Sequence, residues 1–197
     1  MPKIVDKQVI KKHIITSALN AFLKYGFHKT TMNQIAQEAD IAKGTLYLYF
    51  KSKDILISDI TSLHFKRMLD KLIAKEYFQT LDELLFHIKD VLLINEMESK
   101  FIPIFFEAFG SQFSSEAFME DYKKLFDKIG LFYSENFKIL IKNKQISEKI
   151  NPDTLGRVLM SMIDGIILHK GFFKIKEKKY SIMVDDTLNL FRIGLCR

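Results

Sequence analysis

The sequence predicts an all-α protein, with a three-helix headpiece followed by a helical domain of about six helices. Three observations support this fold class. No segment of the 197 residues shows the period-two alternation of apolar and polar residues that is typical of a strand. Apolar residues instead recur every three or four positions along most of the chain. Residues 31–53 also carry the signals of two short helices separated by a tight break.

The first helix is predicted over residues 7–25. Ile14, Ala18 and Phe22 recur at a spacing of four and give this segment one apolar face. Gly26 follows directly, and glycine is the usual residue just beyond a helix C-terminus because it adopts a left-handed backbone at no steric cost. This helix is expected to brace the two short helices that follow it.

The two short helices read as a helix-turn-helix. Thr31 and Gln34 form a T-x-x-Q capping box, which starts the first of them. Asp40 tolerates a left-handed backbone and can end that helix within the break at residues 40–42. The second short helix is predicted over residues 43–50, with Leu46 and Phe50 on its buried face. In such a motif the second helix enters the major groove of DNA.

The exposed side chains of the second short helix suit DNA. Lys43 and Thr45 lie near its N-terminus, where side chains reach base edges, and Gly44 permits a close backbone approach. Tyr47 and Tyr49 can donate their hydroxyls to phosphates. The predicted DNA-binding residues are Thr31, Asn33, Lys43, Gly44, Thr45, Tyr47, Tyr49 and Lys53. The alternative is a helical hairpin that only packs, but an exposed glycine and exposed aromatic and basic residues serve no packing purpose.

The charge of the chain is concentrated at its beginning. Residues 1–54 carry nine lysines and four acidic residues, a balance of +5, whereas the rest of the chain has a balance of +1. A basic segment that contains a helix-turn-helix is the electrostatic pattern of a nucleic-acid-binding domain.

The string KGTLYLYFKSKDIL resembles the DNA-binding signature of the TetR family of bacterial transcriptional regulators, and the resemblance covers about residues 10–58. Two positions depart from the family pattern: Asp40 stands where glycine is usual, and Ala42 where a Ser or Thr helix cap is usual. Losing a cap typically costs about 1 kcal/mol. The resemblance implies a DNA-binding domain in residues 1–52 and an effector-binding and dimerisation domain in residues 53–197.

The remaining helices are predicted over residues 52–75, 80–97, 102–110, 114–143, 152–170 and 181–195. Ser52 caps the first of these, and no Pro- or Gly-rich linker separates it from the headpiece. Pro103 is interpreted as part of the first turn of a short helix, and Asn151 with Pro152 as a helix start. Residues 174–179 are predicted to form a basic loop.

The last two predicted long helices carry apolar stripes. Residues 146–169 also resemble the approach to the dimerising helix of the TetR family, which implies that these helices pair with their symmetry mates as a four-helix bundle. The alternative is that both stripes belong to the core of a single chain. The predicted dimer-interface residues are Leu155, Val158, Leu159, Met162, Ile166, Val184, Leu188 and Phe191.

Nine of the 18 phenylalanines fall between residues 101 and 137. The family resemblance implies an effector pocket in this region, and such a lining suits a small apolar or aromatic molecule. The alternative is ordinary core packing. The predicted ligand-binding residues are Phe86, Met97, Phe101, Phe105, Phe109, Phe113 and Tyr122. Glu107 and Asp164 could anchor a cationic ligand, although a capped or solvated carboxylate is the simpler interpretation of each.

The sequence indicates neither a metal site nor a cofactor. His64, His87 and His169 have no histidine or cysteine partner at helical spacing, and Cys196 is the single cysteine, which fits a reducing cytoplasm. No run of 18 apolar residues predicts a membrane span. The sequence therefore predicts a cytoplasmic, ligand-responsive homodimer that represses transcription from a palindromic operator. The alternatives are a TetR-like regulator controlled by a protein partner, and an enzyme that uses His87 or His169.

Overall fold

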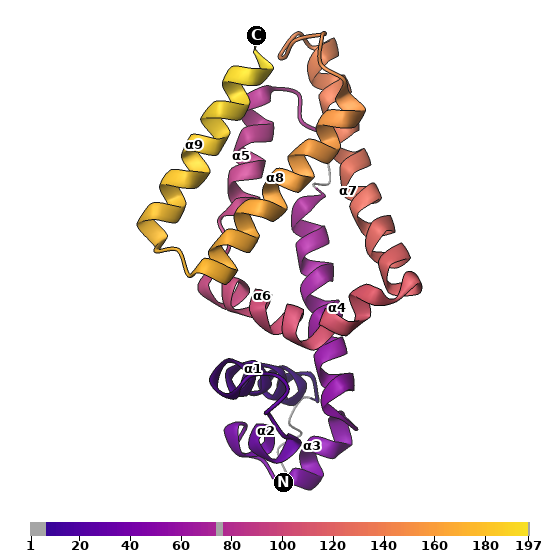
Figure 1. The fold of residues 1–197 in the computed structure, drawn as a ribbon, viewed down its shortest axis with the longest axis vertical. Helices are drawn as coiled ribbons and strands as arrows, with labels where there is room; N and C mark the ends of the chain where they lie inside the picture. The colour runs from indigo at the N-terminus through magenta and orange to yellow at the C-terminus, as the bar shows by residue number, and fades with distance from the viewer. Residues whose placement is uncertain (1–6, 74–76, 197) are drawn as a thin grey trace. The chain divides into compact units, whose positions relative to one another are not determined.

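The computed structural model describes residues 7–73 and 77–196, and within them it contains helices and no strand (Figure 1). The α-helices are α1 (Lys7–Tyr25), α2 (Met32–Glu38), α3 (Lys43–Tyr49), α4 (Lys53–Leu72), α5 (Leu81–Leu92), α6 (Glu96–Phe109), α7 (Glu116–Lys142), α8 (Pro152–Phe173) and α9 (Glu177–Leu195). A short 3-10 helix (Gly110–Ser114) lies between α6 and α7. The all-α prediction is confirmed. None of the described helices combines the length and apolar character needed to cross a bilayer.

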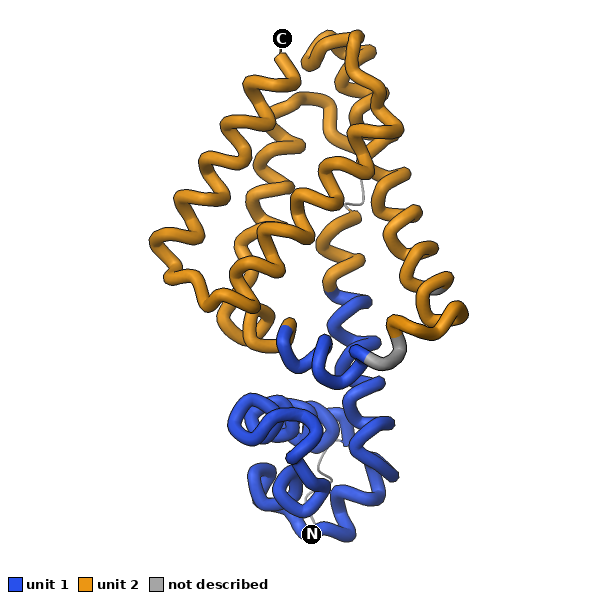
Figure 2. The backbone as a smooth tube through the Cα atoms, viewed as in Figure 1, with its two compact units in different colours: residues 1–67, 103–111 blue, residues 68–102, 112–197 orange. Residues whose placement is uncertain are grey.

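The chain divides into two compact units (Figure 2). Unit 1 combines residues 1–67 with residues 103–111, and unit 2 combines residues 68–102 with residues 112–197. Both α4 and α6 therefore contribute residues to each unit. The domain boundary at residue 52, which follows the helix-turn-helix motif, stays a prediction.

Unit 1 is built on the apolar face of α1. Ile14, Ala18 and Phe22 are buried together with Ile35 of α2 and Leu46 of α3. Burial of an Ile, Leu or Phe side chain contributes about 1.5–3 kcal/mol, so these contacts can fix the two short helices on α1. The first helix thus braces the helix-turn-helix, as the spacing of its apolar residues predicted.

Unit 2 contains a continuous apolar core in which α7 and α8 make the closest approach. A Cβ atom at Gly156 of α8 would lie 2.5 Å from the carbonyl oxygen of Gly130 and 2.4 Å from Oγ of Ser134, both on α7. No other residue type fits at such distances. The largest side chains in this core with no exposed surface are Tyr133, Phe137 and Tyr180.

Three helix boundaries differ from the prediction. α5 ends at Leu92 rather than near Met97, because Asn95 and Glu98 form a reciprocal cap that starts a new helix at Glu96. Pro103 consequently lies inside α6 and not in its first turn. α9 begins at Glu177, so only the first part of the predicted basic loop is a loop.

Candidate nucleic-acid interface

The helix-turn-helix has the local geometry that its sequence predicts. The Thr31 side chain accepts the backbone N–H of Gln34, and the Gln34 side chain accepts the backbone N–H of Thr31. Asp40 has a φ of 49°, which is the left-handed conformation expected for the break. Ala42 has an extended backbone and makes no side-chain capping hydrogen bond to α3. The polypeptide therefore makes the turn without glycine and starts α3 without a cap.

The buried face of α3 fixes which of its residues point outward. Leu46 and Phe50 have no exposed surface, as predicted. Lys43 and Gly44 are exposed, and no atom lies within 4 Å of the position that a Cβ at Gly44 would occupy. Thr45 and Tyr47 are half-buried, and Nζ of Lys43 lies 5.8 Å from the Tyr47 ring centroid.

Leu48 was missed by the sequence analysis. Its side chain is 77 % exposed, although leucine is normally buried. Leu48 lies two residues from both Leu46 and Phe50, which at about 100° per residue places it on the opposite side of the helix. The spacing of Leu46, Leu48 and Phe50 in the sequence is the signal that could have identified this side chain.

Two predicted DNA-binding side chains make hydrogen bonds within the protein. Lys53 donates from Nζ to the carbonyl oxygens of Phe27 and His28, at 2.7 and 3.0 Å, and the same ammonium lies 4.5 Å from the Phe27 ring centroid. Thr31 is occupied by its capping box. A lysine ammonium has three donors, so one N–H of Lys53 is left for a phosphate. Asn33 is exposed on α2, and Tyr49 is half-buried on α3.

A carboxylate from α6 also stabilises the turn after α1. Oε1 of Glu107 accepts the backbone N–H of His28 at 3.0 Å. Burial raises the pKa of Glu107, but the backbone N–H groups of His28 and Phe27 outweigh burial and hold that pKa below its usual value. Glu107 is therefore a capped carboxylate, which is the simpler of the two interpretations made from the sequence.

The uncapped start of α3 gives a testable prediction. Replacing Ala42 by Thr should supply the missing N-cap oxygen and raise the free energy of unfolding by about 1 kcal/mol. The isosteric Ala42→Val variant, which has a methyl group in place of the hydroxyl, is the control. A melting temperature of Ala42→Thr no higher than that of Ala42→Val would contradict the prediction.

The predicted effector residues fall in different surroundings. Phe101 in unit 2 and Phe105 in unit 1 are each 5 % exposed, and Phe109, Phe113 and Tyr122 are half-buried. Met97 is 43 % exposed. Phe86 is 78 % exposed, because Leu84, Leu85 and Ile88 form the core-facing side of α5 and position 86 lies across the helix from it. The ligand-binding role predicted for Phe86 stays a prediction.

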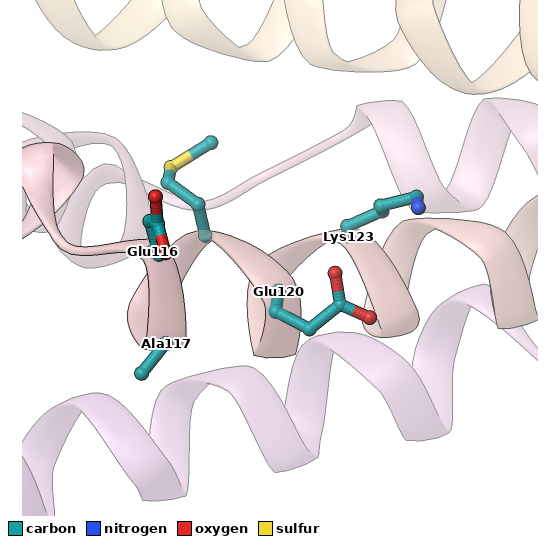
Figure 3. A pocket seen from close by; sticks show the side chains of 5 residues that line it. Glu116, Ala117, Glu120 and Lys123 are labelled. Carbon is teal, nitrogen blue, oxygen red and sulfur yellow. The ribbon is translucent and has the colours of Figure 1, made fainter.

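Two hollows are formed by described residues, and Phe86 is the one predicted ligand-binding residue that lines either of them. The larger, of about 760 Å³, lies along the first turns of α7 and is lined by Glu116, Ala117, Met119, Glu120 and Lys123 (Figure 3). The other, of about 380 Å³, lies between α5 and α9 and includes Phe86. Within the part of the chain that the structure describes, no three His, Cys, Asp or Glu residues are grouped as a metal site would require.

Three predicted dimer-interface residues lie in the core of the chain itself. Leu159 and Val184 have no exposed surface, and Leu188 is 8 % exposed. The remaining half-buried members pack against the same core: Leu155, Met162, Ile166 and Phe191. Of the eight, Val158 alone is largely exposed, at 51 %. The apolar stripes identified from the sequence therefore lie mainly on the faces of α8 and α9 that pack against the core of the same chain.

Both helices also have an outer face of exposed residues, some of which are apolar or small. On α8 this face carries Val158, Ser161, Gly165, His169 and Phe172. On α9 it carries Ile182, Asp186, Asn189 and Ile193. Val158, Ile182 and Ile193 are each 51 % exposed, which is unusual for β-branched apolar residues on a helix. We refer to these two sets as the outer faces of α8 and α9.

Comparison with known proteins identifies relatives of the chain. Residues 14–60 match the family model described as bacterial regulatory proteins, tetR family. The chain is 38 % identical over 61 residues to the uncharacterized HTH-type transcriptional regulator YhgD of Bacillus subtilis (strain 168), covering 31 % of this chain and 32 % of that protein. It is 27 % identical over 171 residues to the regulator YvdT of the same organism, covering 83 % of this chain and 82 % of YvdT.

The fold is also found among solved structures. A TetR transcription regulator from Haloarcula marismortui ATCC 43049 superposes with a TM-score of 0.73, covering 96 % of this chain and 100 % of the other. The two sequences are 16 % identical, so this likeness concerns the fold alone.

Proposed function

Because this chain belongs to the TetR family of DNA-binding transcriptional regulators, we propose that it acts as a homodimeric repressor that binds a palindromic operator and releases it when a small effector binds. The observation that carries the DNA-binding part is the exposed outer side of α3 within a complete helix-turn-helix. The family consists of regulators and not of enzymes, so the enzymatic alternative is discarded. In keeping with this, His87 is hydrogen-bonded to the Leu72 carbonyl in the interior, and burial lowers its pKa.

On this proposal, some residues of α3 contact bases and others contact phosphates. Lys43, Gly44 and Thr45 face base edges, and Tyr47 and Tyr49 donate to phosphates. Asn33 reaches the groove from α2. The main role of Lys53 is to tie α1 to α4 through the Phe27 and His28 carbonyls, and its remaining N–H adds a phosphate contact. Thr31 acts through the cap of α2.

Leu48 adds an apolar contact to this set. An exposed leucine on the side of α3 opposite the core has no hydrogen bond to offer, and the thymine C5-methyl is the apolar group that base pairs present in the major groove. We expect Leu48→Ala to weaken binding to a selected operator about fivefold, roughly the effect of losing one buried methyl or methylene contact.

Replacing thymine by deoxyuridine in the operator tests the Leu48 contact directly. The wild type should bind the substituted operator more weakly, and Leu48→Ala should bind both operators equally. If the wild type does not distinguish thymine from deoxyuridine at any position of the operator, Leu48 has another role.

The proposed function is tested by selecting DNA from a random pool with the full-length protein. A repressor of this kind should enrich a palindrome with half-sites one helical turn or a multiple of it apart, and it should protect both half-sites in footprinting. Enrichment of no sequence, or of a single unpaired half-site, would contradict the proposal.

The dimer is proposed to form through the outer faces of α8 and α9. These faces leave apolar side chains exposed in the single chain, and Ser161 and Gly165 would let a second backbone approach α8 closely. The family resemblance supports this proposal, because it implies that the same helices pair with their symmetry mates as a four-helix bundle. The cytoplasm is the proposed location, where the exposed Cys196 would stay reduced.

A further inference from the structure

The hollow between α5 and α9 is bounded by two ion pairs. The two helices lie side by side in unit 2 and run antiparallel (Figure 1). Nζ of Lys89 lies 2.7 Å from Oδ1 of Asp185, and Arg192 pairs with Asp82. The two ion pairs are about two helical turns apart along α5. We refer to them, together with the other lining residues of the hollow, as the α5–α9 seam; these other residues are Leu85, Phe86, Leu188 and Asn189.

The seam has an apolar interior that is open to solvent. Leu85 and Leu188 are buried at its base. Phe86 stands beside them and is 78 % exposed, which is the largest exposure among the large apolar side chains that the structure describes. Aromatic side chains are enriched in the buried centres of protein interfaces, where they contribute a large contact area. Phe86 is therefore placed to contact a partner and not to stabilise the single chain.

The seam is continuous with the outer face of α9. Asn189 belongs to both, because it lies on that outer face and also lines the hollow. The outer faces of α8 and α9 together contain nine residues, whereas a stable interface has roughly 20–30 residues on each side. A dimer contact that uses these faces must therefore extend beyond them, and the seam is the surface that adjoins α9 through Asn189.

The charges of the seam suit a contact between two identical chains. A two-fold axis brings the same surface of both chains together, so a surface of one sign would be repelled by its copy. The seam carries two acidic and two basic side chains, whose charges sum to zero. Each of the four is at least 43 % exposed, so it can also meet the opposite charge of a second copy.

The surface at the start of α9 does not meet this condition. Residues 174–179 contain four exposed lysines and one acidic residue, Glu177. Glu177 lies 2.9 Å from Nζ of the buried Lys170, which neutralises it within the chain. This surface therefore has charge of a single sign and would be repelled by a second copy of itself. Of the two surfaces, the seam is the one that a homodimer can cover.

We propose that the α5–α9 seam is part of the contact between two copies of this chain, with Phe86 buried against the second copy. This inference rests on the proposed homodimer and deepens it, because it adds a third helix, α5, to the interface formed by α8 and α9. The second copy supplies the apolar contact that Phe86 lacks in the single chain.

Substitution of Phe86 measures its contribution to the dimer. Phe86→Ala should raise the dimer dissociation constant by about thirtyfold, the effect of truncating an aromatic side chain at a well-packed interface. Phe86→Glu should leave mainly monomers, because it places an unpaired charge in the contact twice. Analytical ultracentrifugation measures both effects. Leu131→Glu, at another exposed apolar position of unit 2, should keep the wild-type dissociation constant.

Thiol labelling shows whether position 86 is covered and what covers it. The single natural thiol is removed by Cys196→Ser, and Phe86→Cys or Leu131→Cys then supplies one thiol. At a protein concentration at which the dimer is present, the thiol at position 86 should react with maleimide at least about tenfold more slowly than the thiol at position 131, because it reacts only when the contact opens. Adding Val158→Glu, which is expected to give monomers, should make the two rates equal.

Each outcome supports or overturns the inference. A wild-type dissociation constant for Phe86→Glu, or equal labelling of the two thiols in the dimer, overturns it and leaves a dimer through α8 and α9 in place. Slow labelling that persists in Val158→Glu monomers shows that something other than a second copy occupies the seam, and also overturns it. Slow labelling in a Val158→Glu protein that stays dimeric supports the seam but removes α8 from the interface. A wild type that is monomeric at every concentration overturns the proposed homodimer as well.

Discussion

Replacing Val158 or Ile193 by glutamate is expected to convert the proposed dimer into monomers and to weaken binding to the proposed palindromic operator by about a hundredfold or more. Both side chains are 51 % exposed on the outer faces of α8 and α9, so the single chain tolerates a charge there. In a two-fold symmetric contact each substitution places two unpaired charges in an apolar interface. Loss of the dimer then removes the advantage of binding two linked half-sites.

Light scattering and operator titration measure this effect, and Leu131→Glu is the matched control. Leu131 is 60 % exposed on α7, outside both outer faces, so the same kind of substitution should leave the dimer and the operator affinity unchanged. Leu159→Glu is unsuitable as a test, because Leu159 has no exposed surface and a charge there would disrupt the core of the chain. A dimer that persists in both Val158→Glu and Ile193→Glu would place the interface elsewhere.

Gly156→Leu is expected to lower the free energy of unfolding by about 3 kcal/mol, which for a chain of this size corresponds to a fall in melting temperature of about 10 °C. The new side chain would meet the Gly130 carbonyl oxygen at 2.5 Å and the Ser134 backbone nitrogen at 2.9 Å. Backbone atoms cannot move aside as side chains can, so α7 and α8 must separate and lose part of their packing.

Gly194→Leu is the control for this substitution. Gly194 is also helical, on α9, and no atom lies within 4 Å of the position that its Cβ would occupy. Replacing a helical glycine by leucine in open space should raise helix stability by several tenths of a kcal/mol. Equal melting temperatures for the two variants would show that the close approach of α7 and α8 contributes little to stability.

Local signals allowed most of the fold to be predicted. The capping box at Thr31, the left-handed Asp40 and the buried pair Leu46 and Phe50 each depend on residues within a few positions of one another. The end of α5 was not predictable in the same way, because apolar residues continue past Leu92 and hide the change of helix. The Asn95–Glu98 cap was the available signal for that change.

The candidate sites were harder to predict because they depend on contacts between distant segments. Helical spacing identifies the apolar stripe that contains Leu159, but not whether that stripe meets its own chain or another. Lys53 was identified as a phosphate contact from its position after α3, whereas the carbonyls it binds lie 25 and 26 residues earlier. Leu48 could have been identified from the sequence, because it lies two residues from both Leu46 and Phe50, which were predicted to be buried.

The position of Pro103 has a mechanical consequence. The division between the two units falls between residues 102 and 103, within α6, and again between residues 67 and 68, within α4. Proline has no N–H, so α6 lacks one hydrogen bond of its helical ladder at the step where it passes between units, whereas the sequence of α4 contains no proline. Of the two helices that contribute residues to both units, α6 is therefore expected to bend more easily than α4.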